Sequence, residues 1–257
     1  MGRIHLFEFE DQPWFPDIIR NYMTDYLQFM SNKLKIYQGV LPILRKGLEK
    51  SNGSKILDMA SGGGGGLLHI ADELKGAFPD LKIQLSDLYP NITAFEKTAK
   101  LSSVFSFISQ PVDATKVPKD LKGFRTQFLS LHHLRPPQAT QVLQNAVDSK
   151  SVIGIFETME RGPKNLIGMI LIPVFVLIAT PFVRPFSIGR LVFTYFIPLI
   201  PIFALWDGMV SVLRTYSIKE MNELVANVSN HESYEWEISK AKSGPGEILY
   251  LLGYPKT

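Results

Sequence analysis

Two adjacent histidines, His132 and His133, follow the apolar run TQFLSL in the middle of the chain. A histidine titrates near neutral pH, so a histidine beside a bound substrate can remove a proton from it. We predict both as catalytic residues; the alternative is that one or both cap a strand and bond backbone groups. His5, His69 and His231 stand apart without metal-ligand spacing, and the chain has no cysteine, so we expect no metal site.

A run of glycines, residues 62–66, joins the apolar segment KILDMA to a helical pattern. An ordered glycine costs about 0.5–1 kcal/mol relative to alanine, so such a run predicts a close approach of the backbone to a ligand rather than a flexible loop. Backbone N–H groups and the positive end of the helix dipole would face that ligand. No Gly-Lys-Ser/Thr follows, which argues against a nucleoside triphosphate. A nicotinamide or flavin dinucleotide stays an alternative, because Ala60-x-Gly62-x-x-Gly65 approximates its fingerprint and Asp87 follows at a suitable spacing.

The segment ILDMASGGGG resembles the first motif of class I S-adenosylmethionine-dependent methyltransferases, an acidic residue followed by alternating glycines. The acid is Asp58, the later glycines are Gly62 and Gly64, and Ala60 replaces the first glycine of the family pattern. The resemblance implies S-adenosylmethionine as the cofactor and these residues as its binding loop.

Two later segments resemble further motifs of the same family. In QLSD the resemblance implies that Asp87 accepts hydrogen bonds from both ribose hydroxyls, with Leu88 next to it. In PVDAT it places Asp113 and Ala114 beside the adenine. The segments FEDQPWFPDIIRNYMTDYL, FLSLHHLRPPQA, IGIFE and WDGMVSVLRTY make the whole chain similar to a group of bacterial class I methyltransferases, which implies methyl transfer to an acceptor that the likeness leaves undefined.

Strand and helix patterns alternate over the residues that carry these motifs. Strands are predicted at 55–60, 83–87, 105–113, 126–133 and 151–157, with helices at 67–78, 136–149 and 218–228 and a final hairpin at 234–241 and 247–254. The pattern predicts an α/β fold, a Rossmann-like, seven-stranded, mostly parallel sheet with helices on both faces. We expect a helical cap at 1–50, a methyltransferase core at 51–160 and 217–257, and an apolar helical insert at 161–216.

Polar side chains near the ends of this insert are predicted to bind the acceptor. Glu157 ends the fifth strand, where it binds the acceptor or holds a returning loop. Trp206, Asp207, Arg214 and Tyr216 follow the apolar segment. Asp207 and Arg214 would share one helix face two turns apart. The alternative for that pair is an ion pair that ties the insert to the core.

The insert itself contains two uncharged stretches, residues 166–183 and 191–206. Prolines interrupt both, and arginines lie in the turn between them, which argues against full membrane spanning. A lid or a helical hairpin that dips into one leaflet fits better, with a transmembrane hairpin or an oligomer interface as alternatives. An apolar lid predicts a hydrophobic or lipid-like acceptor.

Composition sets the outer limits on function. The chain has 257 residues, 46% of them hydrophobic, and a net charge of +3, which fits a globular protein and gives no sign of nucleic-acid binding. Its N-terminus has no secretory signal pattern, so we expect a cytoplasmic location with peripheral membrane contact through 166–206 or a homodimer as open alternatives. The rival functions are a dinucleotide-dependent oxidoreductase and a non-catalytic, membrane-associated nucleoside-binding protein.

Overall fold

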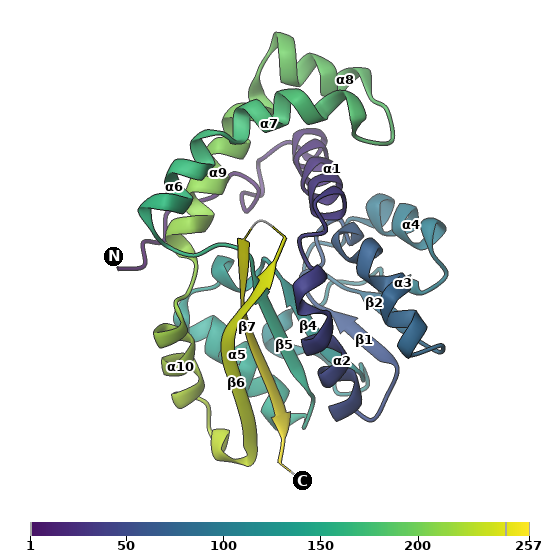
Figure 1. Ribbon diagram of the computed structural model, residues 1–257, viewed down its shortest axis with the longest axis vertical. Coiled ribbons are helices and arrows are strands. Elements are labelled where there is room, and N and C mark those ends of the chain that lie inside the picture. Colours follow the sequence, from purple (N-terminus) through teal and green to yellow (C-terminus); the bar gives the residue numbers. More distant parts are fainter. Residues whose placement is uncertain (1, 245, 257) are drawn as a thin grey trace.

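A seven-stranded sheet forms the centre of the computed structural model, which describes residues 2–244 and 246–256 (Figure 1). Its strands are β1 Lys55–Asp58, β2 Lys82–Leu85, β3 Phe105–Phe107, β4 Phe124–Phe128, β5 Ile153–Glu157, β6 Tyr234–Ser243 and β7 Gly246–Pro255. The order is β3-β2-β1-β4-β5-β7-β6. β1 to β5 are parallel, and β7 runs antiparallel between β5 and β6. The predicted α/β fold with a mostly parallel sheet is confirmed.

Helices cover both faces of this sheet because side chains alternate between the faces along each strand. One face packs against α2 Leu41–Lys50, α3 Leu68–Ala77 and α4 Ile92–Leu101. The other face packs against α5 Pro136–Asp148 and α10 Ile218–Ala226. Each face of the sheet thus has its own hydrophobic core. On β1, Ile56 packs in the core under α2, α3 and α4, and Leu57 packs in the core under α5 and α10.

Several predicted strands are shorter than their apolar patterns. β2 ends at Leu85, β3 at Phe107 and β4 at Phe128. Leu129 has a φ of 49°, in the left-handed region, which breaks the extended backbone before His132 and His133. Both histidines therefore lie in a short 3₁₀ turn, Leu131–His133, rather than in the strand predicted over 126–133. Helix α4 has no counterpart among the predicted elements.

The N-terminal region begins as an irregular segment and continues as α1 Asp17–Lys33 and α2. A short 3₁₀ turn, Gln38–Val40, separates these helices, and Lys35 just before it has a φ of 49°. The helical cap predicted at 1–50 therefore contains two helices that pack in different layers. α2 packs on the sheet, while α1 lies beyond the carboxyl ends of the parallel strands (Figure 1).

The apolar insert forms a bent helical arm on the far side of α1 (Figure 1). Its elements are α6 Pro163–Ile170, α7 Ile172–Ala179, a 3₁₀ turn Thr180–Phe182, α8 Ile188–Leu191, a π-helical turn Val192–Phe196 and α9 Leu199–Arg214. Val176, Ala179 and Ile200 of the arm pack on Phe15, Ile19, Met23 and Tyr26. Arg190 is 1% exposed and donates to Asp25 of α1 at 2.8 Å, so a buried ion pair also fixes the arm.

Among the described residues, every helix of the arm is too short or too polar to cross a bilayer by itself. The pair Pro163–Ile170 with Ile172–Phe182 passes the length and hydropathy criteria only jointly, with a bend of 40°. The pair Ile188–Phe196 with Leu199–Arg214 does so with a bend of 75°. Prolines lie at the starts of α6 and α7 and just before α9, where a missing N–H is tolerated.

Gly64 offers a test of this packing. Its φ is +70°, and a Cβ there would lie 2.4 Å from Leu85 Cδ1 in the buried core. We expect Gly64→Ala to lower the free energy of unfolding by about 1–3 kcal/mol, through backbone strain and overpacking. Urea denaturation followed by circular dichroism measures this change.

Gly76→Ala provides the matched control. Gly76 lies in α3, and a Cβ there would have no atom within 4 Å. Alanine in an open helical position should leave stability unchanged or raise it by up to about 1 kcal/mol. Equal unfolding midpoints for the two variants would contradict the role given to Gly64.

Candidate active site

The glycine run forms the turn between β1 and α3. Ala60, Gly62 and Gly64 have φ values of +52°, +54° and +70°. A Cβ on Gly62 would have no atom within 4 Å, whereas one on Gly63 would lie 2.5 Å from Thr24 Cγ2 of α1. The run therefore has two roles: Gly63 and Gly64 allow close packing within the protein, and Gly62 borders open space.

Asp87 lies against this turn, as the sequence predicts. Its Oδ2 accepts a hydrogen bond from Gly62 N–H at 2.9 Å, and its Oδ1 accepts one from Tyr89 N–H at 2.9 Å. Burial raises the pKa of Asp87, while the hydrogen bonds from Tyr89, Gly62 and Leu88 oppose that shift. The carboxyl group is thus fixed at the carboxyl end of β2, beside the glycine backbone.

Asp58 lies deeper in the sheet than Asp87. It is 3% exposed, and its Oδ1 accepts a hydrogen bond from Thr126 Oγ1–H of the neighbouring strand at 2.8 Å. Burial raises the pKa of Asp58 to about 7, and the charge of Asp87 acts in the same direction. A cation bound near these carboxyl groups would favour their charged forms.

The remaining predicted cofactor residues flank Asp87. Leu88 follows it and is 44% exposed. Val112 N–H donates to Asp87 O at 2.8 Å, which brings the loop after β3 next to the loop after β2. In that loop, Asp113 caps the 3₁₀ turn Ala114–Lys116 by accepting from Thr115 N–H at 2.8 Å. The structure therefore places Asp58 at the end of β1, and Asp87 and Asp113 on the loops after β2 and β3, all on the side of the sheet where the parallel strands end.

His132 and Glu157 form a buried pair at the carboxyl ends of β4 and β5. His132 Nδ1 lies 2.8 Å from Glu157 Oε2, and His132 N–H donates to Glu157 Oε1 at 3.2 Å. Their side chains are 2% and 0% exposed. A carboxylate accepts hydrogen bonds, so it fixes the proton of a neutral His132 on Nδ1 and leaves Nε2 as the acceptor. Glu157 thus holds the loop after β4, one of the two roles predicted for it.

His133 has a different environment from His132. Its Nδ1 lies 2.8 Å from Asp11 Oδ1 and 3.5 Å from Glu8 Oε2, both in the N-terminal segment. Burial by itself would lower the pKa of His133, but the hydrogen bond to Asp11 and the charges of Glu8 and Asp11 outweigh it and raise the pKa to about 9. His133 is therefore a cation at neutral pH.

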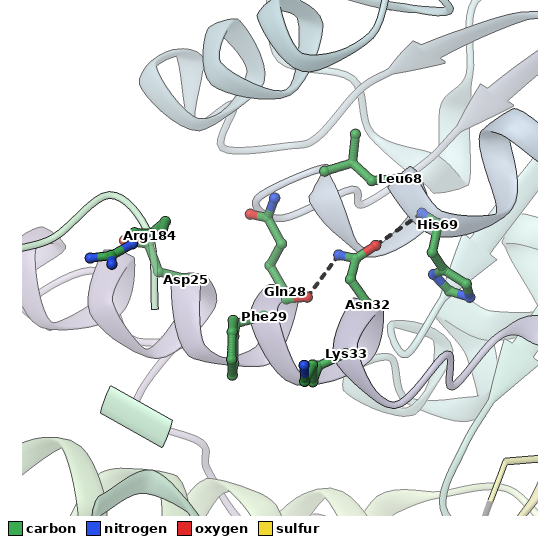
Figure 2. Close-up of a pocket in the computed structure, with 8 residues that line it drawn as sticks. All are labelled: Asp25, Gln28, Phe29, Asn32, Lys33, Leu68, His69 and Arg184. Carbon is green, nitrogen blue, oxygen red and sulfur yellow. Dashed lines mark hydrogen bonds between the residues drawn. The ribbon is translucent and has the colours of Figure 1, made fainter. Parts of the chain in front are cut away.

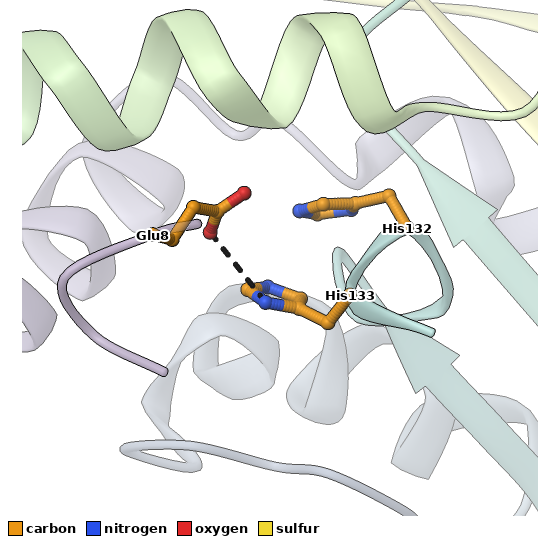
Figure 3. A group of neighbouring side chains, drawn as sticks. All are labelled: Glu8, His132 and His133. Atoms are coloured by element: carbon orange, nitrogen blue, oxygen red, sulfur yellow. Dashed lines mark ion pairs between the residues drawn. The ribbon is translucent and has the colours of Figure 1, made fainter. Parts of the chain in front are cut away.

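Glu8, His132 and His133 together resemble a set of metal ligands (Figure 3). One ligand atom from each lies within 4.8 Å of the others. However, Arg214 lies 3.2 Å from Glu8 and 2.6 Å from Asp11, and His133 is itself protonated. Arginine and a histidinium already supply the positive charge that a metal ion would bring, so the electrostatics favour an ion-pair network.

The four predicted acceptor-binding residues at the end of the insert hold other parts of the chain. Trp206 Nε1–H donates to Phe7 O at 3.0 Å, and Tyr216 O–H donates to Leu134 O at 2.7 Å. Asp207 accepts from Phe9 N–H at 2.7 Å. Asp207 and Arg214 share one face of α9 as expected, and each binds the N-terminal segment rather than the other. The ion pairs of Arg214 with Glu8 and Asp11 tie the end of the insert to that segment, which is close to the alternative expected for this pair.

Sequence reasoning missed the residues that the N-terminal segment contributes. Glu8 is 1% exposed and Asp11 bonds both His133 and Arg214. Glu10 lies among them with a buried Oε1 that has no hydrogen-bond partner among the described residues, and burial together with the charges of Asp207 and Glu8 raises its pKa to about 8. The cluster of acids in FEDQPW was the one local signal for this segment.

A separate cavity of about 510 Å³ lies between α1, the start of α3 and the tip of the arm (Figure 2). Its walls are formed by Asp25, Gln28, Phe29, Asn32, Lys33, Leu68, His69 and Arg184. His69 N–H donates to Asn32 Oδ1 at 2.9 Å, which joins α3 to α1 at the cavity wall. The sequence analysis did not predict this cavity.

Solved structures with a similar fold include methyltransferases. The sequence matches no protein-family model and no curated protein. The plantazolicin methyltransferase BpumL in complex with SAH matches with a TM-score of 0.52 and 12% identity, over 96% of this chain and 93% of that one. Human N-acetylserotonin methyltransferase in complex with SAM matches with a TM-score of 0.51 and 14% identity, over 93% of this chain. PigF with SAH matches with a TM-score of 0.52 and 18% identity, over 95% of this chain.

The chain therefore shares the fold of these three structures, in agreement with the α/β fold that the sequence motifs implied. It spans 58% of the human enzyme and 63% of PigF, both of which are longer.

The pKa of His133 gives a test of the ion-pair network. Because its folded-state pKa of about 9 lies above the ordinary 6.5, His133 stabilises the fold below pH 6.5, and this contribution is lost as the pH rises through 9. We expect Asp11→Asn to lower the pKa of His133 by about 1–3 units and to flatten that pH dependence. NMR titration of the imidazole protons and urea unfolding over this pH range measure both effects.

Asp17→Asn is the control for that experiment. Asp17 is an exposed acid that pairs only with Arg20 among the described residues. Its removal should leave the pKa of His133 unchanged. An identical His133 titration in Asp11→Asn and wild type would show that the network does not exist in solution.

Proposed function

We propose that this protein is an S-adenosylmethionine-dependent methyltransferase that acts on a small acceptor, with His132 as the general base. The observation that carries the proposal is the buried His132–Glu157 pair at the carboxyl ends of β4 and β5. In open α/β sheets, ligands bind beyond these strand ends, at the point where strand order reverses. Here that point lies between β1 and β4, next to the glycine turn and Asp87.

The residues around the glycine turn fit S-adenosylmethionine. Gly62 borders open space, and the Asp87 carboxyl group is positioned to accept hydrogen bonds from ribose hydroxyls. We propose that the backbone of Ala60, Gly62 and Gly64 lines the cofactor. The partly protonated Asp58 suits a cationic ligand, because a nearby positive charge favours its ionised form.

The loops after β2 and β3 would complete the cofactor site. In this proposal Leu88, Asp113 and Ala114 lie beside the adenine, since the bond from Val112 to Asp87 holds the two loops together. S-adenosylmethionine supplies a methyl group on a sulfonium, which is already a good leaving group. The protein has to orient the acceptor, take up its proton and exclude water.

His132 suits the role of the base better than His133. With its proton held on Nδ1 by Glu157, His132 presents an unprotonated Nε2. When the acceptor takes the methyl group and the sulfonium sulfur leaves as a neutral thioether, Nε2 would take up the proton that the acceptor loses, and Glu157 would stabilise the resulting imidazolium. His133 has no free site for a proton at neutral pH, because Asp11 keeps it charged. We assign it an electrostatic role near Asp87.

The acceptor is proposed to be small and apolar, because the arm above the site carries an apolar surface. Trp206, Asp207, Arg214 and Tyr216 would shape its pocket by holding the segment that covers His132. We propose that the chain consists of a cap at 1–50, a core at 51–160 and 217–257, and an insert at 161–216. We also propose a cytoplasmic location. A homodimer or a membrane contact would each use the exposed surface of the arm.

Both rival functions fit the structural observations less well. A dinucleotide-binding sheet has the parallel order 3-2-1-4-5-6, whereas here an antiparallel β7 separates β5 from β6. A buried histidine–carboxylate pair at the strand ends costs desolvation free energy, and a catalytic base there accounts for its position beside the proposed cofactor site better than the loop contact alone does.

Cofactor binding is the first test of the proposed function. Isothermal titration calorimetry with S-adenosylmethionine should give saturable binding to the wild type. Asp87→Ala removes the ribose acceptor and should weaken binding at least about tenfold, the loss expected for hydrogen bonds to a charged group. Wild-type protein that binds a nicotinamide dinucleotide and not S-adenosylmethionine would overturn the proposal.

The base assignment is tested by methyl transfer. Tritium transfer from labelled S-adenosylmethionine to cell extracts identifies an acceptor fraction. With that fraction, His132→Asn and Glu157→Gln should lower kcat about 10²–10⁴-fold while cofactor affinity stays within error. His231→Asn, in a half-exposed histidine near the start of β6, is the control and should keep full activity. Full activity in His132→Asn would exclude it as the base.

A further inference from the structure

The arm holds most of the exposed large hydrophobic side chains among the residues that the structure describes. Its exposed large hydrophobic residues are Ile167, Ile170, Leu171, Val174, Phe175, Leu177, Ile178, Phe182, Phe186, Ile188, Tyr195, Phe196, Ile197, Ile202 and Trp206. By contrast, residues 51–160 expose only Leu88, Tyr89 and Leu101 among the residues that the structure describes. Contiguous apolar patches of this kind on a protein surface mark a site of interaction.

The exposed residues follow one side of the arm. On the helical stretch through α7, the residues Leu171, Phe175, Ile178 and Phe182 recur every three or four positions and are 45–63% exposed. Val176 and Ala179 lie on the other side and pack against α1. The arm is therefore not amphipathic in the usual way. Both of its faces are apolar, and protein covers only one of them.

The charge of the arm favours an anionic partner. Residues 161–206 contain four basic residues and no acidic residue. Arg161 bonds Glu220 at 3.0 Å, and Arg190 is buried against Asp25. Lys164 and Arg184 are both exposed, and Arg184 lies between the exposed Phe182 and Phe186 at the tip. Aromatic side chains around a cation are typical of the membrane–water interface.

The shape of the arm favours the plane of the interface over a path across the bilayer. A spanning helix needs about 20 consecutive apolar residues. α7 and α9 have 8 and 16 residues, and the joints to their neighbours bend by 40° and 75°. The second half of α9 is also buried against the N-terminal segment through Asp207 and Arg214, which leaves no freedom to reorient it.

We propose that the arm is a monotopic membrane anchor. Its outer face, defined by Leu171, Phe175, Ile178, Phe182 and Phe196, enters the acyl chain boundary of one leaflet, and Arg184 and Lys164 bind anionic lipid headgroups. The anchor is independent of the proposed methyl transfer, and it places the glycine turn and His132 on the cytoplasmic side of that leaflet, in reach of apolar molecules dissolved in it.

Vesicle flotation of the full chain tests the anchor. Wild type should float with vesicles of phosphatidylcholine mixed with phosphatidylglycerol, and more weakly with phosphatidylcholine alone. Phe182→Ser and Phe196→Ser should each lower the partition coefficient about tenfold on both vesicles, since each phenyl ring leaves the lipid phase. Arg184→Gln should lower it about fivefold on the anionic vesicles only.

Leu101→Ser is the matched control, because Leu101 is 68% exposed on α4, outside the arm. It should float like the wild type. Thermal unfolding of each variant checks the fold, and Phe196, at 81% exposed, tolerates serine without loss of core contacts. Asp87→Ala should also float normally, so failure of the anchor and failure of cofactor binding are separate results.

Three outcomes would overturn the anchor. One is a wild-type chain that stays in the aqueous fraction with both vesicles. Another is a dimer in sedimentation velocity that Phe196→Ser dissociates, without vesicle binding, which would make the face a contact between two copies. The third is cleavage after the exposed Phe186 by chymotrypsin enclosed in the vesicle, which would show a hairpin that spans the bilayer.

Discussion

The ion pair between Arg214 and the N-terminal acids is the interaction on which the arrangement above the sheet depends. Arg214 is 3% exposed, so its charge has to be matched within the protein. Glu8 and Asp11 supply the matching charges, and Leu6 O accepts from Arg214 Nε–H at 2.7 Å. An arginine buried at the end of α9 therefore fixes an irregular N-terminal segment that has no sheet or helix of its own.

That segment in turn determines the state of the two histidines. The carboxylate of Asp11 stabilises the charged form of His133. Arg3 donates to His132 O at 2.9 Å and so binds the loop that carries both histidines. His132 keeps only 2% of its surface exposed as a result. The two histidines, identical in type and adjacent in sequence, thus have different partners: His133 is charged beside the N-terminal acids, and His132 is buried against Glu157. This difference makes separate roles possible.

The sequence was most informative where function depends on local pattern. The glycine run, Asp58 and Asp87 all lie within the β1–α3–β2 unit or directly after it. Residues so near in the sequence are also near in the fold, so their spacing along the chain was informative. Apolar alternation likewise located the strands. Strand ends were less predictable: Leu129 adopts a left-handed backbone conformation that its residue type gives no reason to expect, and the strand predicted through His133 ends before it.

The hydrogen-bond and ion-pair partners of the histidines could not be predicted from the sequence, for a different reason. His133 and Asp11 are 122 residues apart, and Arg214 and Asp11 are 203 apart. No periodicity links such positions, because the pairing arises from the path of the N-terminal segment across the finished fold. The prediction that Asp207 and Arg214 share a helix face was correct, since it rests on helical geometry alone, but their partners lie in a segment with no regular structure.

Helix α9 joins the two halves of the proposed function. Its first half carries Ile202 and Trp206 on the exposed apolar surface, and its second half carries Asp207 and Arg214 against the segment that covers His132. Trp206 belongs to both, since its ring is 38% exposed while its N–H bonds Phe7 O. A continuous helix is stiff over this length, so a force on the outer face of the arm reaches the N-terminal segment without a flexible joint between them. In the proposed function and anchor, this helix would join the surface that meets the membrane to the segment that covers the site, and an acceptor arriving from the leaflet would meet the arm before it meets the base.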